Sequence, residues 1–185
     1  MLLPLLLAVD VALQTTLGTI VLRLDQHRAP VTTANFLRYV DGHRYDGAAF
    51  YRAVPEVARA GGRPTISVIQ GGLETKLGDA GVAKLPTIPI EPTTKTGLSN
   101  LPGTIAMARS TDPNSASSEF FINVADDTML DAQRFRDGAG YAVFGRVVRG
   151  MDVVRTILDA PARPDPVMSE ILTPPVTIVR AYRVR

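Results

Sequence analysis

The chain has 185 residues, 45% of them apolar, and a formal net charge of +2. This length favours one domain of about 100–200 residues, and so small a net charge does not indicate a nucleic-acid-binding protein. The sequence has no cysteine and only two histidines, His27 and His43. It therefore excludes a disulfide framework, a His-rich metal site and a cysteine nucleophile. No glycine-rich nucleotide-binding motif and no GxSxG elbow is present.

Residues 1–10 form an apolar N-terminal segment, with the run LLPLLLAV at residues 2–9. This run is too short to span a bilayer, which takes about 20 residues. No Lys or Arg precedes it, and no clear small-x-small cleavage site follows it. Two interpretations stay open, a remnant of an export signal or an apolar end that lies on the domain. We expect residues 11–185 to form the single domain.

The first predicted elements are two strands and a helix. Residues 11–24 are rich in Thr, Val, Ile and Leu and read as two short strands with a turn at Leu17-Gly18. Pro30 then begins a helix that Gly42 ends. The predicted apolar stripe of this helix consists of Val31, Ala34, Leu37 and Val40, with Phe36 adjacent.

The rest of the chain predicts more strands and one more helix. The predicted strands cover residues 48–54, 65–70, 104–108, 119–124, 141–148 and 176–184, and the helix covers 150–158. We expect a surface excursion over residues 73–101 and an extended tether over the proline-rich residues 159–175. The pattern indicates an all-β fold, a closed eight-stranded antiparallel barrel capped by two α-helices.

Three fragments carry a resemblance to a known family. They are Phe50-Tyr51-Arg52, the run VIQGG at residues 68–72, and GTIAMARSTDPNSASSEFFINVADD at residues 103–127; YAVFGRVVRGMDVV at 141–154 strengthens the match. Over roughly residues 13–184 the sequence resembles the cyclophilins, and in particular bacterial cyclophilins, the periplasmic ones among them. The resemblance implies a peptidyl-prolyl cis–trans isomerase with an eight-stranded barrel and two helices.

The chemistry of such an enzyme fits this composition. Rotation about a peptide bond costs about 18–20 kcal/mol, and X-Pro bonds exchange over tens to hundreds of seconds. A catalyst has to bind the twisted bond better than either planar form. A fixed donor aimed at the proline nitrogen would do this, because the twisted nitrogen regains a basic lone pair. The reaction requires no metal, cofactor or nucleophile, and we expect none.

The resemblance assigns the catalytic donor to Arg52 and its support to Gln70. Phe121 corresponds to the floor of the proline pocket, whereas strand alternation turns Phe120 toward the core. The substrate-binding residues implied by the resemblance are Phe50, Val68, Met107, Ala108, Arg109, Glu119, Phe121, Met129, Leu130 and Tyr141.

Several of these positions depart from the family pattern. Glu119 stands where Gln is usual, and an ionised Glu can only accept hydrogen bonds. It could pair with Arg109 or another nearby arginine, favour substrates with a basic neighbour, or reach Arg52 and lower activity. Val68 is smaller than the usual residue, and Tyr141 replaces a frequent His. Met129 replaces a Trp that helps to bind cyclosporin, so we expect weak cyclosporin binding.

Two insertions also depart from the pattern, residues 55–64 between Arg52 and Gln70 and residues 132–140. We expect both to border the substrate groove, the first as a surface loop or as a modifier of access.

The leading hypothesis is an active isomerase that binds proline-containing peptides and folding chains as a monomer, with no nucleic acid and no stable membrane span. The alternative is a proline-peptide-binding chaperone or scaffold module with weak or lost activity. We expect it in the periplasm or cell envelope of a bacterium; the alternative is the cytoplasm.

Overall fold

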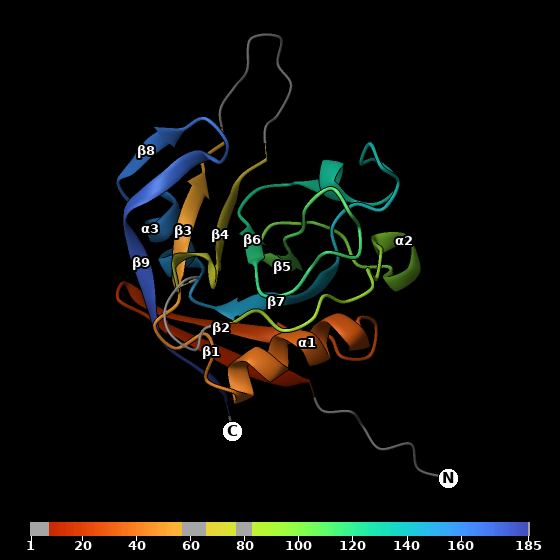
Figure 1. Cartoon of the computed structure of the whole chain (residues 1–185), viewed down its shortest axis with the longest axis horizontal. Helices are drawn as coiled ribbons and strands as arrows, with labels where there is room; N and C mark the ends of the chain where they lie inside the picture. The colour runs from red at the N-terminus through yellow and green to blue at the C-terminus, as the bar shows by residue number, and fades with distance from the viewer. Residues whose placement is uncertain (1–7, 57–65, 77–82, 185) are drawn as a thin grey trace.

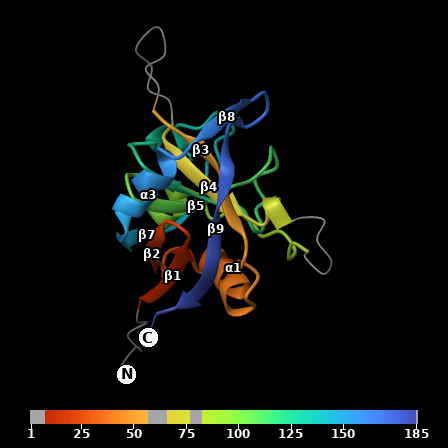
Figure 2. The same ribbon diagram turned by 90° about the vertical axis from the view of Figure 1, so that its left-hand side faces the viewer.

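The centre of the molecule is a closed antiparallel β-barrel (Figures 1 and 2). The computed structural model describes residues 8–56, 66–76 and 83–184. The strands are β1 (Val9–Thr15), β2 (Gly18–Leu24), β3 (Ala49–Val54), β4 (Val68–Gly72), β5 (Thr104–Met107), β6 (Phe120–Asn123), β7 (Val143–Arg149), β8 (Ala162–Asp165) and β9 (Ser169–Arg183).

Eight of these strands form the barrel in the order β1-β2-β7-β5-β6-β4-β3-β9, and pairing of β9 with β1 closes it. The predicted eight-stranded closed barrel is therefore confirmed. The ninth strand, β8, pairs only with the start of β9. The tether predicted over residues 159–175 is thus wrong, because this segment folds into a hairpin that extends the barrel wall (Figure 1).

The two predicted helices are present as α1 (Pro30–Asp41) and α3 (Met151–Leu158), and they lie on opposite sides of the barrel (Figure 2). A third helix, α2 (Thr93–Thr96), is a single turn within the predicted excursion. The 3-10 turns η1 (Glu74–Lys76) and η2 (Thr128–Leu130) complete the elements. The prediction of two helices missed α2 because four residues are too few to show helical periodicity.

The apolar stripe predicted for α1 is only half right. Leu37 and Val40 are buried, but Val31 and Ala34 are exposed. Polar residues take their place because the buried carboxylate of Glu91 accepts hydrogen bonds from the N–H and hydroxyl of Thr32, at 2.8 and 2.7 Å. A helix end that is anchored by a carboxylate buries its polar residues there, which a hydrophobic pattern alone does not reveal.

The barrel interior is filled by apolar side chains, with an aromatic cluster beneath α1. Phe36 of α1 lies 5.4 Å from Phe120 and 5.2 Å from Phe144, between ring centroids. Phe50 packs edge-on against Phe120 at 5.6 Å. Phe120 is fully buried, as strand alternation predicted. This cluster ties α1 to β3, β6 and β7, the part of the barrel that includes the candidate site.

The apolar N-terminal run lies outside the described residues, apart from Ala8 and Val9. Within residues 8–56, 66–76 and 83–184, no helix has the length and apolar character needed to cross a bilayer.

One buried carboxyl group makes the fold sensitive to pH. Asp127 is 1% exposed; its Oδ1 accepts a hydrogen bond from the Ser67 N–H at 2.9 Å, and its Oδ2 finds no partner among the described residues. Burial raises the pKa of Asp127 to about 7, and the neighbouring Asp126 and Glu56 add to the rise. The folded chain therefore holds a proton that the unfolded chain releases near pH 4.

The contribution of Asp127 to the free energy of unfolding should fall as pH rises from about 4 to 7, because over this window Asp127 binds fewer protons in the unfolded state than in the folded state. Asn is uncharged at every pH, so Asp127→Asn should gain on the wild type by about 3 kcal/mol between pH 4.5 and pH 8. Denaturant unfolding at the two pH values measures this gain. Asp10→Asn is the control, because the hydrogen bond from Arg23 lowers the pKa of Asp10 and reverses the trend. An equal difference at both pH values would contradict the assignment.

Candidate active site

A β-bulge in β3 places the candidate catalytic arginine. In the pairing of β3 with β4, Phe50 faces Gly71 and Arg52 faces Gln70, so Tyr51 is the extra residue. In a regular strand Phe50 and Arg52 would point to the same face. The bulge separates them, because the side chain of Phe50 enters the barrel core while Arg52 lines a cavity on the outer face.

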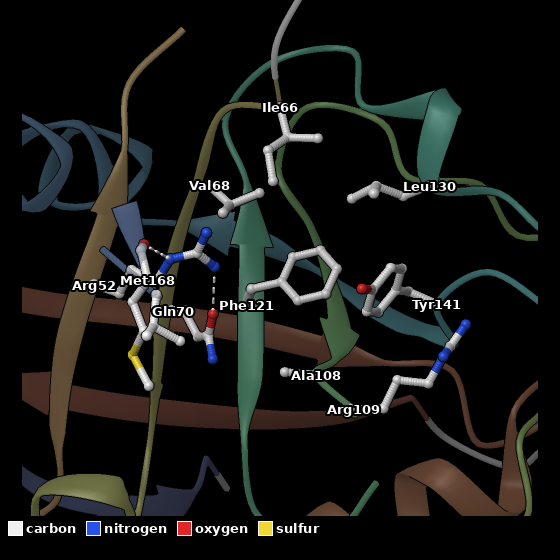
Figure 3. Close-up of a pocket in the computed structure, with 11 residues that line it drawn as sticks. Arg52, Ile66, Val68, Gln70, Ala108, Arg109, Phe121, Leu130, Tyr141 and Met168 are labelled. Carbon is white, nitrogen blue, oxygen red and sulfur yellow. Dashed lines mark hydrogen bonds between the residues drawn. The ribbon is translucent and has the colours of Figure 1, made fainter. Parts of the chain in front are cut away.

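The cavity has a volume of about 230 Å³ and lies against the outer face of β4, β6 and β5 (Figure 3). It is lined by Arg52, Ile66, Val68, Gln70, Ala108, Arg109, Phe121, Leu130, Tyr141, Val167 and Met168. Neighbouring strands bring Arg52, Gln70 and Phe121 side by side, since Gln70 pairs with Arg52 on one side and with Phe121 on the other. A second apolar cluster, separate from the barrel core, includes Val68, Phe121 and Leu130.

The floor of the cavity is aromatic and its opposite wall is polar. The Phe121 ring meets Tyr141 edge-on at 5.5 Å, and Tyr141 meets Phe135 at 5.2 Å. Figure 3 shows the guanidinium of Arg52 and the amide of Gln70 on the other side of the Phe121 ring. An apolar ring seated on Phe121 would therefore lie beside fixed hydrogen-bond donors.

Arg52 is held from two directions. Its Nη1 donates to Gln70 Oε1 at 2.8 Å, and its Nε donates to the carbonyl oxygen of Met168 at 2.5 Å. Burial lowers the pKa of Arg52, yet an arginine stays protonated at any physiological pH. The two bonds leave Nη2 without a hydrogen-bond partner among the described residues, so the guanidinium is both fixed and able to donate further.

Among the described residues, Glu119 pairs with no arginine and does not contact Arg52, so these two expectations are wrong. Its carboxylate accepts hydrogen bonds from the Tyr51 hydroxyl at 3.0 Å, the Leu73 N–H at 3.0 Å and the Ser118 hydroxyl at 2.7 Å. The nearest cation is Lys84, with Nζ 3.8 Å from Oε1. Glu119 therefore lies behind the site, outside the cavity lining.

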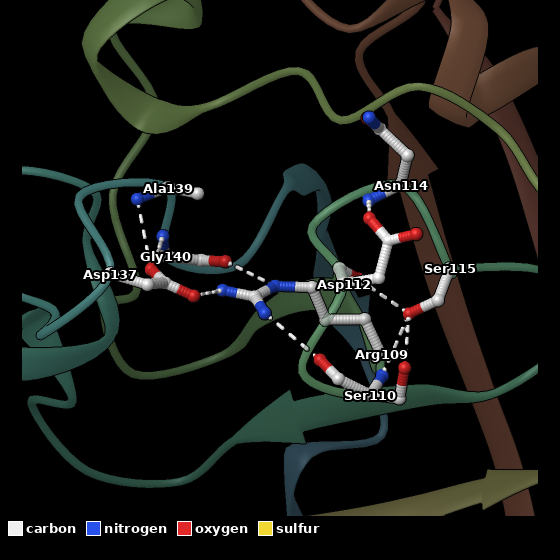
Figure 4. Close-up of polar contacts among 8 residues, drawn as sticks. All are labelled: Arg109, Ser110, Asp112, Asn114, Ser115, Asp137, Ala139 and Gly140. Atoms are coloured by element: carbon white, nitrogen blue, oxygen red, sulfur yellow. Dashed lines mark hydrogen bonds and ion pairs between the residues drawn. The ribbon is translucent and has the colours of Figure 1, made fainter.

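Arg109 joins the cavity to the second insertion (Figure 4). Its guanidinium donates to the Gly140 carbonyl at 2.8 Å and pairs with Asp137. It also lies over the Tyr141 ring, 4.9 Å from the centroid. Backbone N–H groups of Ala139 and Gly140 help Arg109 to lower the pKa of Asp137 to about 2. Arg109 thus fastens the insertion, whose last residue, Gly140, precedes Tyr141.

The sequence and the fold were compared with known proteins. Residues 9–183 match the family model described as cyclophilin type peptidyl-prolyl cis-trans isomerase. A peptidyl-prolyl cis-trans isomerase of Acinetobacter baylyi is 39% identical over 169 residues, which cover 91% of this chain and 82% of that protein. Peptidyl-prolyl cis-trans isomerase A of Dickeya dadantii is 42% identical and covers 80% of this chain and 70% of its own length.

The chain belongs to the cyclophilin family. Relatives of this similarity are named peptidyl-prolyl cis–trans isomerases, so this cyclophilin is an enzyme of that class. The fold agrees: a cyclophilin-type isomerase of Cryptosporidium parvum covers 96% of this chain and 98% of its own, with a TM-score of 0.72 at 20% identity. A second structure of that protein, determined in the presence of the dipeptide Ala-Pro, gives a TM-score of 0.71.

Most of the residues that the sequence resemblance selected lie together around the cavity of this cyclophilin. Eight line the cavity: Arg52, Val68, Gln70, Ala108, Arg109, Phe121, Leu130 and Tyr141. Four do not: Phe50 and Met107 are buried in the barrel core, Met129 is 42% exposed outside the lining, and Glu119 lies behind Tyr51. Phe50, which the resemblance assigned to substrate binding, does not line the cavity because the bulge directs its side chain into the barrel core.

The sequence reasoning missed three lining residues, Ile66, Val167 and Met168. Val167 and Met168 lie in the turn between β8 and β9. The predicted tether treated this segment as an extended connection without a partner strand. β8 has the sequence ARPD and buries none of its residues, so the sequence shows no apolar–polar alternation that would indicate this hairpin. The core of the first insertion, residues 57–65, lies outside the described residues. No group of three His, Asp or Glu side chains gathers as a metal site in the described ranges.

Removing the charge of Asp137 should loosen the wall that carries Tyr141. We expect Asp137→Asn to raise the KM for a proline peptide about threefold, because the Arg109 side chain, which is only 3% exposed, then loses its charged partner beside Tyr141. Steady-state isomerisation kinetics measure the KM. Asp41→Asn is the matched control, because it breaks the exposed Arg183–Asp41 pair, which is not part of the cavity. The same KM in Asp137→Asn and the wild type would contradict this role.

Proposed function

We propose that this cyclophilin accelerates rotation of X-Pro bonds by seating the proline ring on Phe121 and donating a hydrogen bond from Arg52 to the prolyl nitrogen. The fixed donor is the observation that carries the proposal. Gln70 and Met168 hold the guanidinium on the polar side of the cavity, and Phe121 forms its apolar floor. The bond can then turn while the ring stays in place.

The selectivity for the twisted state comes from amide chemistry. In a planar amide the nitrogen lone pair is delocalised into the carbonyl and accepts hydrogen bonds poorly. At the twist, resonance is lost and the lone pair becomes available, so Arg52 stabilises the transition state more than either ground state. A guanidinium suits this role because its N–H groups are directional and permanently charged.

The alternative, a binding module with weak or lost activity, rests on three departures from the family pattern: Glu119, Val68 and the insertion at residues 55–64. Glu119 is occupied by Tyr51, Leu73 and Ser118 and does not compete for the guanidinium. No contact of Glu119 therefore favours this alternative.

Arg52→Ala should remove most of the catalysis. Loss of one preorganised donor lowers rates by about 10²–10³, so the variant should approach the spontaneous isomerisation rate in a protease-coupled assay with a proline tetrapeptide. Arg52→Lys should recover only a small part, because an ammonium cannot donate to Gln70, Met168 and substrate in one plane. Circular dichroism controls for folding. A wild type no faster than the spontaneous reaction would reject the proposed function.

Assistance to folding chains follows from the same reaction, since prolyl isomerisation limits the rate of many folding reactions. The partners that we propose are proline-containing peptides and unfolded proteins bound by a monomer. We also propose weak cyclosporin binding, because a flexible Met129 stands where an aromatic residue would give a larger contact.

The proposed location is the periplasm or cell envelope of a bacterium. The apolar residues 2–9 and the absence of cysteine motivate it, and the relatives from Acinetobacter and Dickeya are bacterial. Fractionation of cells expressing the full chain should place it with periplasmic markers, and replacing Leu5–Leu7 by three Asp residues should retain it with cytoplasmic markers. Wild-type chain found only with the cytoplasmic markers would contradict the proposal.

A further inference from the structure

We propose that Tyr51 and Glu119 are positioning residues, which fix the orientation of the Gln70 amide and through it the donor that Arg52 presents to substrate. The inference rests on the proposed function and adds to it two residues outside the cavity lining. It also gives the bulge in β3 a chemical role besides turning Arg52 outward.

The four residues form one continuous chain of hydrogen bonds. Arg52 Nη1 donates to Gln70 Oε1 at 2.8 Å, Gln70 Nε2 donates to the Tyr51 hydroxyl at 2.7 Å, and that hydroxyl donates to Glu119 Oε2 at 3.0 Å. Three strands supply these residues: Tyr51 and Arg52 lie on β3, Gln70 lies on β4, and Glu119 immediately precedes β6. Each bond has the length of an ordinary hydrogen bond.

The direction of donation is set at both ends of this chain. A guanidinium can only donate, and an ionised carboxylate can only accept. Tyr51 must therefore give its proton to Glu119, which turns a lone pair of the hydroxyl toward Gln70. The Gln70 amide then has a single favourable orientation, with Nε2 toward Tyr51 and Oε1 toward Arg52. An amide flipped by 180° would set its N–H groups against the Arg52 guanidinium.

The surroundings of Glu119 hold its carboxylate in place. Oε1 accepts from the Leu73 N–H and the Ser118 hydroxyl. Gly72 packs directly against the carboxylate, and a Cβ at this position would collide with it. Gly72 has a φ of +148°, so both the backbone and the close approach call for glycine. The carboxylate thus occupies a fitted space between β4 and the start of β6.

The charge state of Glu119 determines whether the direction of donation along this chain of hydrogen bonds stays fixed. The titratable groups that face Glu119 are Lys84, Tyr45 and Tyr51. Lys84 Nζ also lies 3.5 Å from Oε2 of Glu74, so the two carboxylates share this cation. Burial raises the pKa of Glu119, although hydrogen bonds from Ser118 and Tyr51 and the charge of Lys84 oppose the rise. A protonated Glu119 can donate to Tyr51, which would free the hydroxyl to donate to Gln70 and permit the flipped amide.

The central experiment is a double-mutant cycle on kcat/KM for a proline tetrapeptide. Tyr51→Phe should lower kcat by about tenfold with little change in KM, because the donor acts on the twisted state. In a Gln70→Ala background the same substitution should have no further effect, because Tyr51 acts only through Gln70. Tyr39→Phe is the matched control: it removes another largely buried hydroxyl, which accepts from the Leu85 N–H, and should leave kcat unchanged.

The pH profile gives a second readout that a merely structural role would not move. Wild-type kcat should fall as pH decreases through the pKa of Glu119, because protonation removes the fixed polarity. Glu119→Gln cannot ionise and can donate to Tyr51 at every pH. Its kcat should therefore be about threefold to tenfold lower at neutral pH and flat in the acid range.

The outcomes separate this inference from the proposed function. A wild type without isomerase activity rejects the proposed function itself. If the wild type is active, three results would each overturn the positioning role of Tyr51 and Glu119 and leave the proposed function intact. They are an unchanged kcat in Tyr51→Phe, an equal loss of kcat from Tyr51→Phe with and without Gln70, or a higher kcat in Glu119→Gln. The last result would instead mean that Glu119 restrains the enzyme. Thermal unfolding of every variant identifies losses that come from misfolding.

Discussion

The bulge at Tyr51 is the constraint on which the site depends. A strand with regular alternation would send Phe50 and Arg52 to the same face. The barrel needs an aromatic residue inside at Phe50, and the site needs a cation outside at Arg52. One extra residue satisfies both requirements within three positions of sequence. Tyr51 then stands between the two faces, where its hydroxyl links Gln70 to Glu119.

The same sheet carries two apolar clusters with different uses. The inner cluster, with Phe36 and Phe120, fills the barrel and fastens α1. The outer cluster, around Phe121 and Val68, leaves room for a ligand. Because Phe120 and Phe121 are adjacent on β6, a rigid interior directly supports the floor of the cavity. The site can therefore keep a fixed shape without a metal or disulfide among the described residues.

Much of this arrangement could be predicted from the sequence, and what was missed has physical reasons. Strand alternation correctly separated Phe120 from Phe121, and the family resemblance selected Arg52 and Gln70. A bulge leaves no trace in a hydrophobic pattern, so the inward direction of Phe50 and the outward direction of Arg52 could not be predicted from it. The contact between Met168 and Arg52 joins residues 116 positions apart, and sequence spacing carries no information about such a pairing. The position of the Glu119 carboxylate is set by Tyr51 and Gly72, which only the fold brings together.

The hairpin that holds Arg52 also belongs to the strand that completes the barrel. Met168 lies just before β9, and β9 runs from the site to β1, where it closes the sheet (Figure 1). A chain leaves the ribosome N-terminus first, so Arg52 and Gln70 exist long before their last support is made. The second hold on the guanidinium forms only when the end of the chain has docked. A copy that lacks β8 and β9 therefore keeps the bond from Arg52 to Gln70 but lacks the second hold on the guanidinium.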